Sequence, residues 1–253
     1  MPTALALSPH LDDAAFSCGG LLHGLARDGW RVVMATLFTA SVNRPSGFAL
    51  ACQTDKGLGA EVDYMRLRRA EDDAAARALG VTARHLPFRE APHRGYGSAP
   101  ALFEAVRADD GIVPGLTAAI GDLLAELRPD LLLAPQAVGG HVDHVQVVRA
   151  IDAAAPHAPI LWWRDFPYTV RDRTPKEPLR DRFADLADAE CRFGPEGQAA
   201  KGAACAAYAT QLGFQFGGPE GLAARLSVEG GVERFRREGD LPEGLGRILA
   251  DVG

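Results

Sequence analysis

The chain has 253 residues, of which 47% are hydrophobic and 24% are charged. This composition is typical of a globular protein, and the length allows a full hydrophobic core. The formal net charge of −6 and the lack of a basic stretch argue against nucleic acid as a partner. No apolar run reaches the roughly 20 residues that span a bilayer, so no membrane span is expected.

The cysteines and the N-terminus indicate the compartment. Cys18, Cys52, Cys191 and Cys205 are far apart and form no CxxC pair, which argues against a zinc ribbon and against a disulfide framework. The N-terminal segment has no basic region of the kind that opens a signal peptide. We therefore expect a cytoplasmic protein with reduced thiols. A homo-oligomer is compatible with the sequence.

Strand-like and helix-like segments alternate along the chain. Apolar runs predict five strands, at 4–8, 30–39, 83–88, 130–136 and 159–166. Segments with helical periodicity or helix-end signals predict helices between them, at 14–29, 63–80, 114–129 and 142–155. This alternation predicts an α/β fold with an open, mainly parallel, Rossmann-like sheet flanked by helices. Five strands are too few for a closed eight-stranded barrel.

The remaining segments complete the expected organisation. Residues 171–253 read as a mostly helical C-terminal extension that packs on an α/β core of residues 1–170, so that 1–253 form a single domain. Segments 40–62 and 89–112 are rich in glycine, proline and polar residues and are expected to be long loops at a pocket rim.

Two short clusters of histidine and aspartate each follow a predicted strand. "SPHLDDA" (8–14) comes after the first strand, and "GGHVDHV" (139–145) comes after the strand at 130–136. Ligands of open α/β sheets bind at the carboxyl ends of the strands. We therefore expect the two clusters to meet at one edge of the sheet and to form a metal site there.

Helix capping is the simpler explanation of the aspartates. Asp12 or Asp13 could cap the helix that follows, and Asp143 with Gln146 fits a capping box. Capping, however, requires one aspartate per helix and no histidine. The joint occurrence of both residue types in two strand-end loops favours the metal site.

Spacing alone leaves the ligand assignment open. The side chains of two adjacent aspartates must diverge, so one can bind a metal while the other faces the space beside it. His141 and His144 lie three residues apart and share one side of a helical turn, so either can be the ligand. A catalytic zinc ion typically has three protein ligands and one open position.

"PHLDDAAFSCGG" together with "GGHVDH" resembles the PIG-L/LmbE-like family of zinc-dependent N-deacetylases, which carry an AHPDDE-like motif and an HxDH motif. The resemblance extends in the expected order through 36–39, 66–80, 165–168 and 201–211. It implies that His10, Asp13 and His144 are the metal ligands and that Asp12 is the general base. It also implies that His141 and Asp143 assist at the reacting carbonyl. The implied cofactor is Zn²⁺, with another divalent ion such as Fe²⁺ as the alternative.

Two positions depart from the family motif. Leu11 replaces the usual proline and Ala14 replaces an acidic residue, but neither is an expected ligand.

Asp143 is expected to favour the protonated form of His141, which would then stabilise the oxyanion.

The resemblance implies an N-acetylated amino-sugar conjugate, such as an N-acetylglucosaminide, as the small-molecule substrate. The residues expected to contact it are Arg68, Arg89, Glu90, Arg94 and Tyr168. An alternative for Arg68 is a solvent-facing i,i+3 pair with Glu71.

Two other functions remain as alternatives. The spacing His10-x-Asp12 with a distant histidine also fits a non-haem Fe(II) oxygenase, although those ligands normally lie on a β-barrel. The second alternative is a non-catalytic α/β binding module whose aspartates only cap helices.

Overall fold

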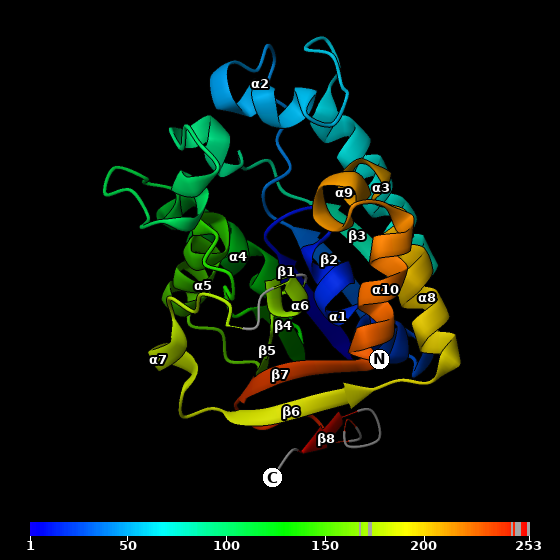
Figure 1. Cartoon of the computed structure of the whole chain (residues 1–253). Coiled ribbons are helices and arrows are strands. Elements are labelled where there is room, and N and C mark those ends of the chain that lie inside the picture. Colours follow the sequence, from blue (N-terminus) through cyan, green and yellow to red (C-terminus); the bar gives the residue numbers. More distant parts are fainter. Residues whose placement is uncertain (167, 172–173, 244, 246–248, 252–253) are drawn as a thin grey trace.

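A computed structural model of the chain describes residues 1–166, 168–171, 174–243, 245 and 249–251. Its sheet has eight strands in the order β3-β2-β1-β4-β5-β7-β6-β8. Five strands form the parallel part, and they match the five predicted segments (Figure 1). They are β1 (Thr3–Ser8), β2 (Arg31–Thr36), β3 (Thr82–His85), β4 (Leu131–Pro135) and β5 (Ile160–Trp163). The expected Rossmann-like sheet is therefore confirmed.

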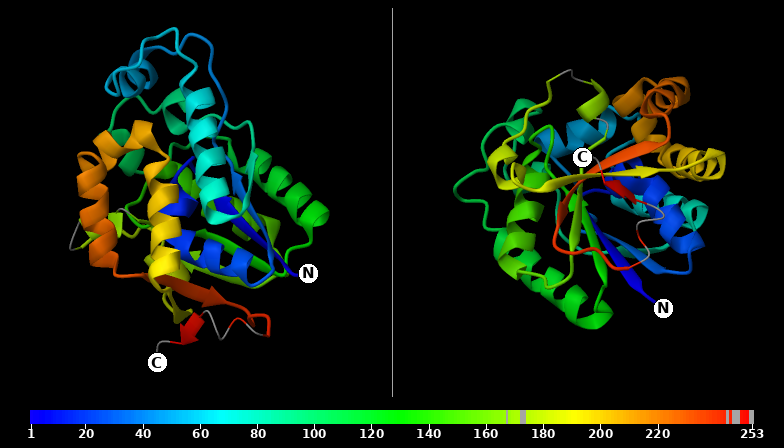
Figure 2. Two further views of the ribbon diagram at one scale, coloured as in Figure 1. Left: turned by 90° about the vertical axis from the view of Figure 1, so that its right-hand side faces the viewer. Right: turned by 90° about the horizontal axis from the view of Figure 1, so that it is seen from below.

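Helices cover both faces of this sheet (Figure 2). One face packs against α1 (Asp13–Arg27), α3 (Tyr64–Leu79) and α8 (Pro195–Ala206), and the other packs against α4 (Val113–Leu127) and α5 (Val142–Ala154). Successive β1 residues alternate between the two cores: Ala4 and Ala6 face the first, whereas Leu5 and Leu7 face the second. A strand buried on both faces requires the continuous apolar run that the sequence shows.

The C-terminal part is more than a helical extension. It contains α7 (Arg180–Phe183), α9 (Ala209–Phe216) and α10 (Pro219–Glu229) in addition to α8. It also supplies three antiparallel strands that continue the sheet beyond β5, namely β6 (Ala187–Arg192), β7 (Val232–Glu238) and β8 (Leu249–Asp251). The sequence did not reveal these strands, because charged residues interrupt the apolar pattern of "VERFRRE".

The two segments expected to be long loops contain short helices. Residues 40–62 include α2 (Gly47–Thr54), and residues 89–112 include two 3₁₀ turns, η1 (Ala91–Arg94) and η2 (Pro100–Phe103). A four-residue helix, α6 (Tyr168–Arg171), follows β5. In Figure 1, α2 lies beyond the ends of β1 and β2, on the side that carries the histidine clusters. Among the described residues, no helix is both long and apolar enough to cross a membrane.

Candidate metal centre and active site

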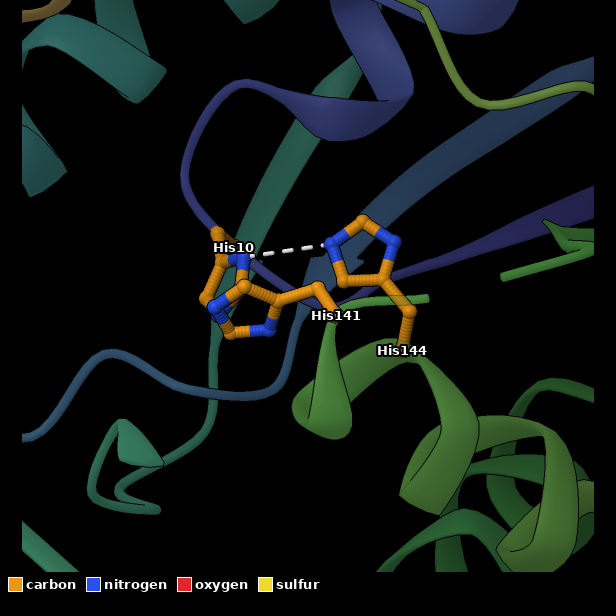
Figure 3. Close-up of side chains that lie close together, drawn as sticks. All are labelled: His10, His141 and His144. Atoms are coloured by element: carbon orange, nitrogen blue, oxygen red, sulfur yellow. Dashed lines mark hydrogen bonds between the residues drawn. The ribbon is translucent and has the colours of Figure 1, made fainter. Parts of the chain in front are cut away.

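The two histidine clusters meet where the strand order reverses. β1 pairs with β4 in parallel, while β2 and β3 continue from β1 in one direction and β5 continues from β4 in the other. Loops that leave two such strands diverge and open a crevice between them. The loop after β1 carries His10 and the loop after β4 leads to His144, and the two rings lie side by side (Figure 3). Nε2 of His144 is 3.3 Å from Nδ1 of His10.

Three side-chain atoms in this crevice form a nearly equilateral triangle. Oδ2 of Asp13 lies 3.2 Å from Nδ1 of His10 and 3.1 Å from Nε2 of His144, and the third side is the 3.3 Å contact between the histidines. Ligand atoms about 2.0–2.1 Å from a tetrahedral zinc ion lie about 3.3–3.4 Å apart. The residues present therefore fit a divalent metal ion with three protein ligands.

His141 also faces this group. The imidazoles of His10, His141 and His144 each offer a nitrogen within 4.8 Å of the others. Nδ1 of His141, however, accepts a hydrogen bond from the backbone N–H of Asp143 at 3.2 Å, so Nε2 carries the proton of the neutral ring. A nitrogen that carries a proton is a hydrogen-bond donor and not a ligand. His141 therefore presents an N–H to the pocket, whereas Asp13 presents a carboxylate oxygen to the other two histidines.

A carboxylate holds the far ring nitrogen of both His10 and His144. Oδ2 of Asp143 is 2.9 Å from Nε2 of His10, and Oδ1 of Asp165 is 2.7 Å from Nδ1 of His144. Such outer carboxylates fix the orientation and tautomer of metal-binding histidines. No role was predicted for Asp165 from the sequence. Its position just after β5, at the same edge of the sheet, was the signal that could have identified it.

Helix capping does not explain the aspartates. The N–H of Ala14 at the start of α1 bonds to Oγ of Ser8, and the Asp12 side chain makes no capping bond. The cap of α5 is His141, whereas Asp143 lies inside the first turn. The capping interpretations of Asp12 and of the Asp143–Gln146 pair are therefore wrong.

Asp12 occupies a strained backbone position next to Asp13 and close to Arg68. Its φ of 153° and ψ of −32° lie in a region that non-glycine residues rarely adopt, as is common at functional sites. Its Oδ2 lies 3.5 Å from Nη2 of Arg68, and the residue is 4% exposed. Burial, opposed by Arg68 and reinforced by Asp13, raises the pKa of Asp12 to about 7.

Burial and the neighbouring carboxylates shift the pKa values of the three histidines in different directions. Burial lowers the pKa of a histidine. At His10, Asp13 and Asp143 outweigh burial and raise the pKa well above its usual value. At His144, Asp13 and Asp165 outweigh burial and raise the pKa to about 9. Burial, reinforced by the positive charge of His10, lowers the pKa of His141 to about 3. Asp143 acts in the expected direction and raises the pKa of His141, but burial and the charge of His10 outweigh it, so the neutral ring is favoured.

The carboxylate of Asp143 is fully occupied by other groups. Oδ2 accepts from the backbone N–H of Ala91 at 3.0 Å in addition to its contact with His10, and Oδ1 accepts from Arg94 at 2.7 Å. These contacts hold the Asp143 carboxylate against protein groups, and its expected direct role at the carbonyl stays a prediction.

Two of the five expected substrate contacts face away from the site. Arg94 lies behind Asp143, where it also binds Asp110 through two nitrogens, and it does not line the pocket. Arg89 is exposed outside the pocket, and its carbonyl oxygen accepts a hydrogen bond from Arg94. Both orientations depend on how the loop at 89–112 folds, which the sequence does not show. Arg94 turns towards Asp110 and Asp143, and Arg89 turns towards solvent.

The other three expected contacts line the pocket. Nη1 of Arg68 donates to Oε1 of Glu90 at 2.5 Å, and Nη2 donates to the carbonyl oxygen of Leu11 at 2.9 Å, so Arg68 supports the loop that carries the aspartates. The alternative pairing of Arg68 with Glu71 is wrong, because Glu71 accepts from the N–H and hydroxyl of Thr210. The ring of Tyr168 packs against the backbone of Gly139, where a Cβ atom would lie 2.4 Å from the ring and where φ is +94°.

Comparisons with known proteins agree with this geometry. The family described as PIG-L, GlcNAc-PI de-N-acetylase, matches residues 5–155. The chain is 37% identical over 167 residues to 2'-N-acetylparomamine deacetylase of Streptomyces fradiae, a match that covers 65% of this chain and 57% of that protein. It is 30% identical over 164 residues to 1D-myo-inositol 2-acetamido-2-deoxy-alpha-D-glucopyranoside deacetylase of Corynebacterium glutamicum (strain R). This match covers 62% of this chain and 54% of that protein. The chain thus spans a little over half the length of these curated relatives.

A solved structure extends the similarity to almost the whole chain. The crystal structure of the antimicrobial reagent A40926 pseudoaglycone deacetylase Dbv21 matches with a TM-score of 0.78 and 28% identity, over 95% of this chain and 98% of that one. The family match covers well over half of the present chain and includes both histidine clusters. The chain therefore belongs to the PIG-L family, whose model is described as GlcNAc-PI de-N-acetylase.

Proposed function

We propose that the protein is a metal-dependent N-deacetylase that hydrolyses the N-acetyl group of an amino-sugar conjugate. The observation that carries the proposal is the triangle of His10 Nδ1, Asp13 Oδ2 and His144 Nε2, with sides of 3.1 to 3.3 Å, beside a second buried carboxylate. Family membership and the named activities of the relatives support this chemistry.

We propose that His10, Asp13 and His144 hold the metal ion and that the ion is zinc. A bound divalent ion polarises a carbonyl oxygen and makes hydroxide available near neutral pH. Histidine and carboxylate ligands in tetrahedral spacing suit zinc, and Fe²⁺ is the alternative. Asp143 and Asp165 keep the two rings in the orientation that this ligand set requires.

Asp12 and His141 are proposed as the residues that act on the substrate. Both line the pocket beside the ligand group. A water molecule attacks the amide carbonyl carbon, and Asp12 accepts a proton from it. The neutral His141 donates its Nε2–H to the negative charge that develops on the carbonyl oxygen. Asp12 then returns its proton to the leaving nitrogen, which completes the cleavage of the C–N bond.

We make three further proposals, on the domain organisation, the substrate contacts and the location of the protein. We propose that 1–253 act as a single deacetylase domain, which the continuous sheet from β3 to β8 supports. Glu90, Arg68 and Tyr168 are proposed to contact the sugar, because they line the pocket next to the ligand group. A cytoplasmic location is proposed from the four free cysteines.

The test is amine release from a panel of N-acetylated amino-sugar conjugates, with the metal content of the purified protein measured in parallel. We expect stoichiometric metal, loss of activity with a chelator and recovery on addition of Zn²⁺. The variant His141→Gln should keep the metal and lose at least about tenfold in kcat. Oxygen-dependent turnover with Fe²⁺ would favour the oxygenase instead, and a folded protein that binds no metal would favour the binding module.

A further inference from the structure

Beyond the ligand group, the wall of the active-site pocket is mostly apolar. Four side chains that share this wall come from three segments far apart in the sequence: Phe48 in α2, Leu102 and Phe103 in η2, and Phe214 in α9. We call these four residues the apolar wall. None of them has a part in the hydrolysis proposed above, because none carries a group that can transfer a proton or bind a metal.

The inner end of the apolar wall adjoins the reacting centre. The ring of Phe103 stands edge-on to the ring of His141, with centroids 5.3 Å apart, and its centroid is 5.9 Å from that of Tyr168. Lys176 donates to the carbonyl oxygen of Phe103 and so anchors η2. A substrate whose carbonyl reaches His141 therefore passes along Phe103.

The outer end of the apolar wall is exposed but held in place. Phe214 is 68% exposed, and Nζ of Lys56 lies 5.0 Å from the centre of its ring and 5.5 Å from that of Tyr64. The same Nζ donates to the carbonyl oxygen of Cys52 at 2.8 Å, which ties α9 to α2. Such cation–π contacts orient an aromatic ring that buries little of its own apolar surface.

An acetylated sugar alone does not account for this wall. A sugar ring presents hydroxyl groups around small C–H faces and an acetyl group presents one methyl, so together they cover less apolar surface than three aromatic rings and a leucine offer. Single exposed apolar residues need no explanation, but four that converge on one pocket from separate segments mark a ligand-binding surface.

Building on the proposed deacetylase function, we propose that the natural substrate carries an apolar group larger than acetyl, which packs against Phe48, Phe103 and Phe214. Two parts of a conjugate could supply this hydrocarbon, namely the aglycone and a longer N-acyl chain. Both would leave the amide carbonyl at His141, and the experiment separates them.

Two substrate series test the proposal with the metal-loaded full chain. The first keeps the N-acetyl group of glucosamine and lengthens the aglycone from methyl to butyl to octyl, and the second keeps the methyl glycoside and lengthens the acyl group from acetyl to butyryl to octanoyl. We expect kcat/KM to rise by about tenfold or more along one series, which identifies the source of the hydrocarbon. A flat or falling kcat/KM in both series overturns the inference. Hydrolysis of no member in either series would instead contradict the deacetylase function itself.

Substitutions then locate the binding surface. Phe214→Ala and Phe48→Ala should reduce the ratio of kcat/KM between the longest and the shortest member of the responsive series, and Phe214→Leu should retain most of it. The matched control is Val228→Ala, because Val228 on α10 is 75% exposed and lies outside this pocket. An unchanged ratio in both alanine variants, with metal content and circular dichroism as in the parent protein, would overturn the assignment of the wall.

Discussion

Nε2 of His10 lies 2.9 Å from Oδ2 of Asp143, a residue 133 positions further along the chain. The contact leaves Nδ1 as the only nitrogen of His10 that can bind a metal, and it turns that atom towards Asp13 and His144. Asp143 is 0% exposed and is held in turn by Arg94 and by the N–H of Ala91. The orientation of the first proposed ligand is therefore set by a residue from the second cluster.

Asp143→Asn should lower zinc affinity about 10- to 100-fold, because the amide is a weaker partner for the His10 ring and removes a buried negative charge. Competition with a chelating dye measures the affinity. Asp109→Asn is the control, because Asp109 forms an exposed pair with Arg107 and should leave the affinity unchanged. Equal affinities of the parent and the Asp143 variant would contradict the positioning role.

Asp12→Asn should keep the metal but lower kcat by about 10²- to 10⁴-fold, the usual range for loss of a general base. The amide retains the shape of the side chain and cannot accept the proton. Asp13→Asn is the paired variant and should lose metal instead, because Asp13 is a proposed ligand. Metal content by mass spectrometry and kcat on the best substrate distinguish the two. A normal kcat for Asp12→Asn would remove the base assignment.

Ser8→Ala should destabilise the protein by about 1 kcal/mol, the typical loss for a helix cap. Oγ of Ser8 accepts from the N–H of Ala14 at 3.1 Å and donates to the carbonyl oxygen of His10 at 2.7 Å. Ser46→Ala is the matched control, because Ser46 precedes α2 without a capping bond. Denaturant unfolding of metal-free protein gives both free energies. The prediction is wrong if the two variants lose the same amount.

Gly20→Ala should destabilise the fold by about 1–3 kcal/mol, the usual cost of overpacking a core. A Cβ atom at Gly20 would lie 2.3 Å from the ring of Phe193, at the kink of α1 near Cys18. Gly121→Ala in α4 meets no atom within 4 Å and should instead stabilise the protein by up to about 1 kcal/mol. Urea titrations measure both, and a stable Gly20→Ala protein would show that Phe193 can move away.

Glu229 should make stability fall as the pH rises towards neutrality. Burial, opposed by Lys201 and reinforced by Glu233, raises the pKa of Glu229 to about 7. The pKa of Glu229 is higher in the folded than in the unfolded protein, so the folded state binds the Glu229 proton more tightly. This contribution to the unfolding free energy is complete below about pH 4.5 and is lost as pH rises through about 7. Glu229→Gln should therefore match the parent near pH 5 and exceed its unfolding free energy at pH 8. Parallel pH profiles for the two proteins would contradict this prediction.

Local patterns determined the elements that build the parallel sheet. Residues 4–7 of β1 and the whole of β4 are apolar because both faces of these strands are buried, and the helices between them carry their own periodicity and end signals. The position of each histidine cluster directly after such a strand was enough to predict that they meet. The predicted proximity of His10 and His144 is confirmed by the 3.3 Å contact.

Tertiary structure decided the features that depend on partners distant in sequence. β7 carries Glu233 on its buried side, where both carboxylate oxygens accept from the N–H groups of Gly20 and Leu21, so its pattern does not resemble a strand. The neutral state of His141 follows from burial beside other histidines, and the inward turn of Arg94 follows from its pairs with Asp110 and Asp143. Apolar periodicity is a local property of the chain, whereas charge pairing and desolvation arise only when separate segments come together.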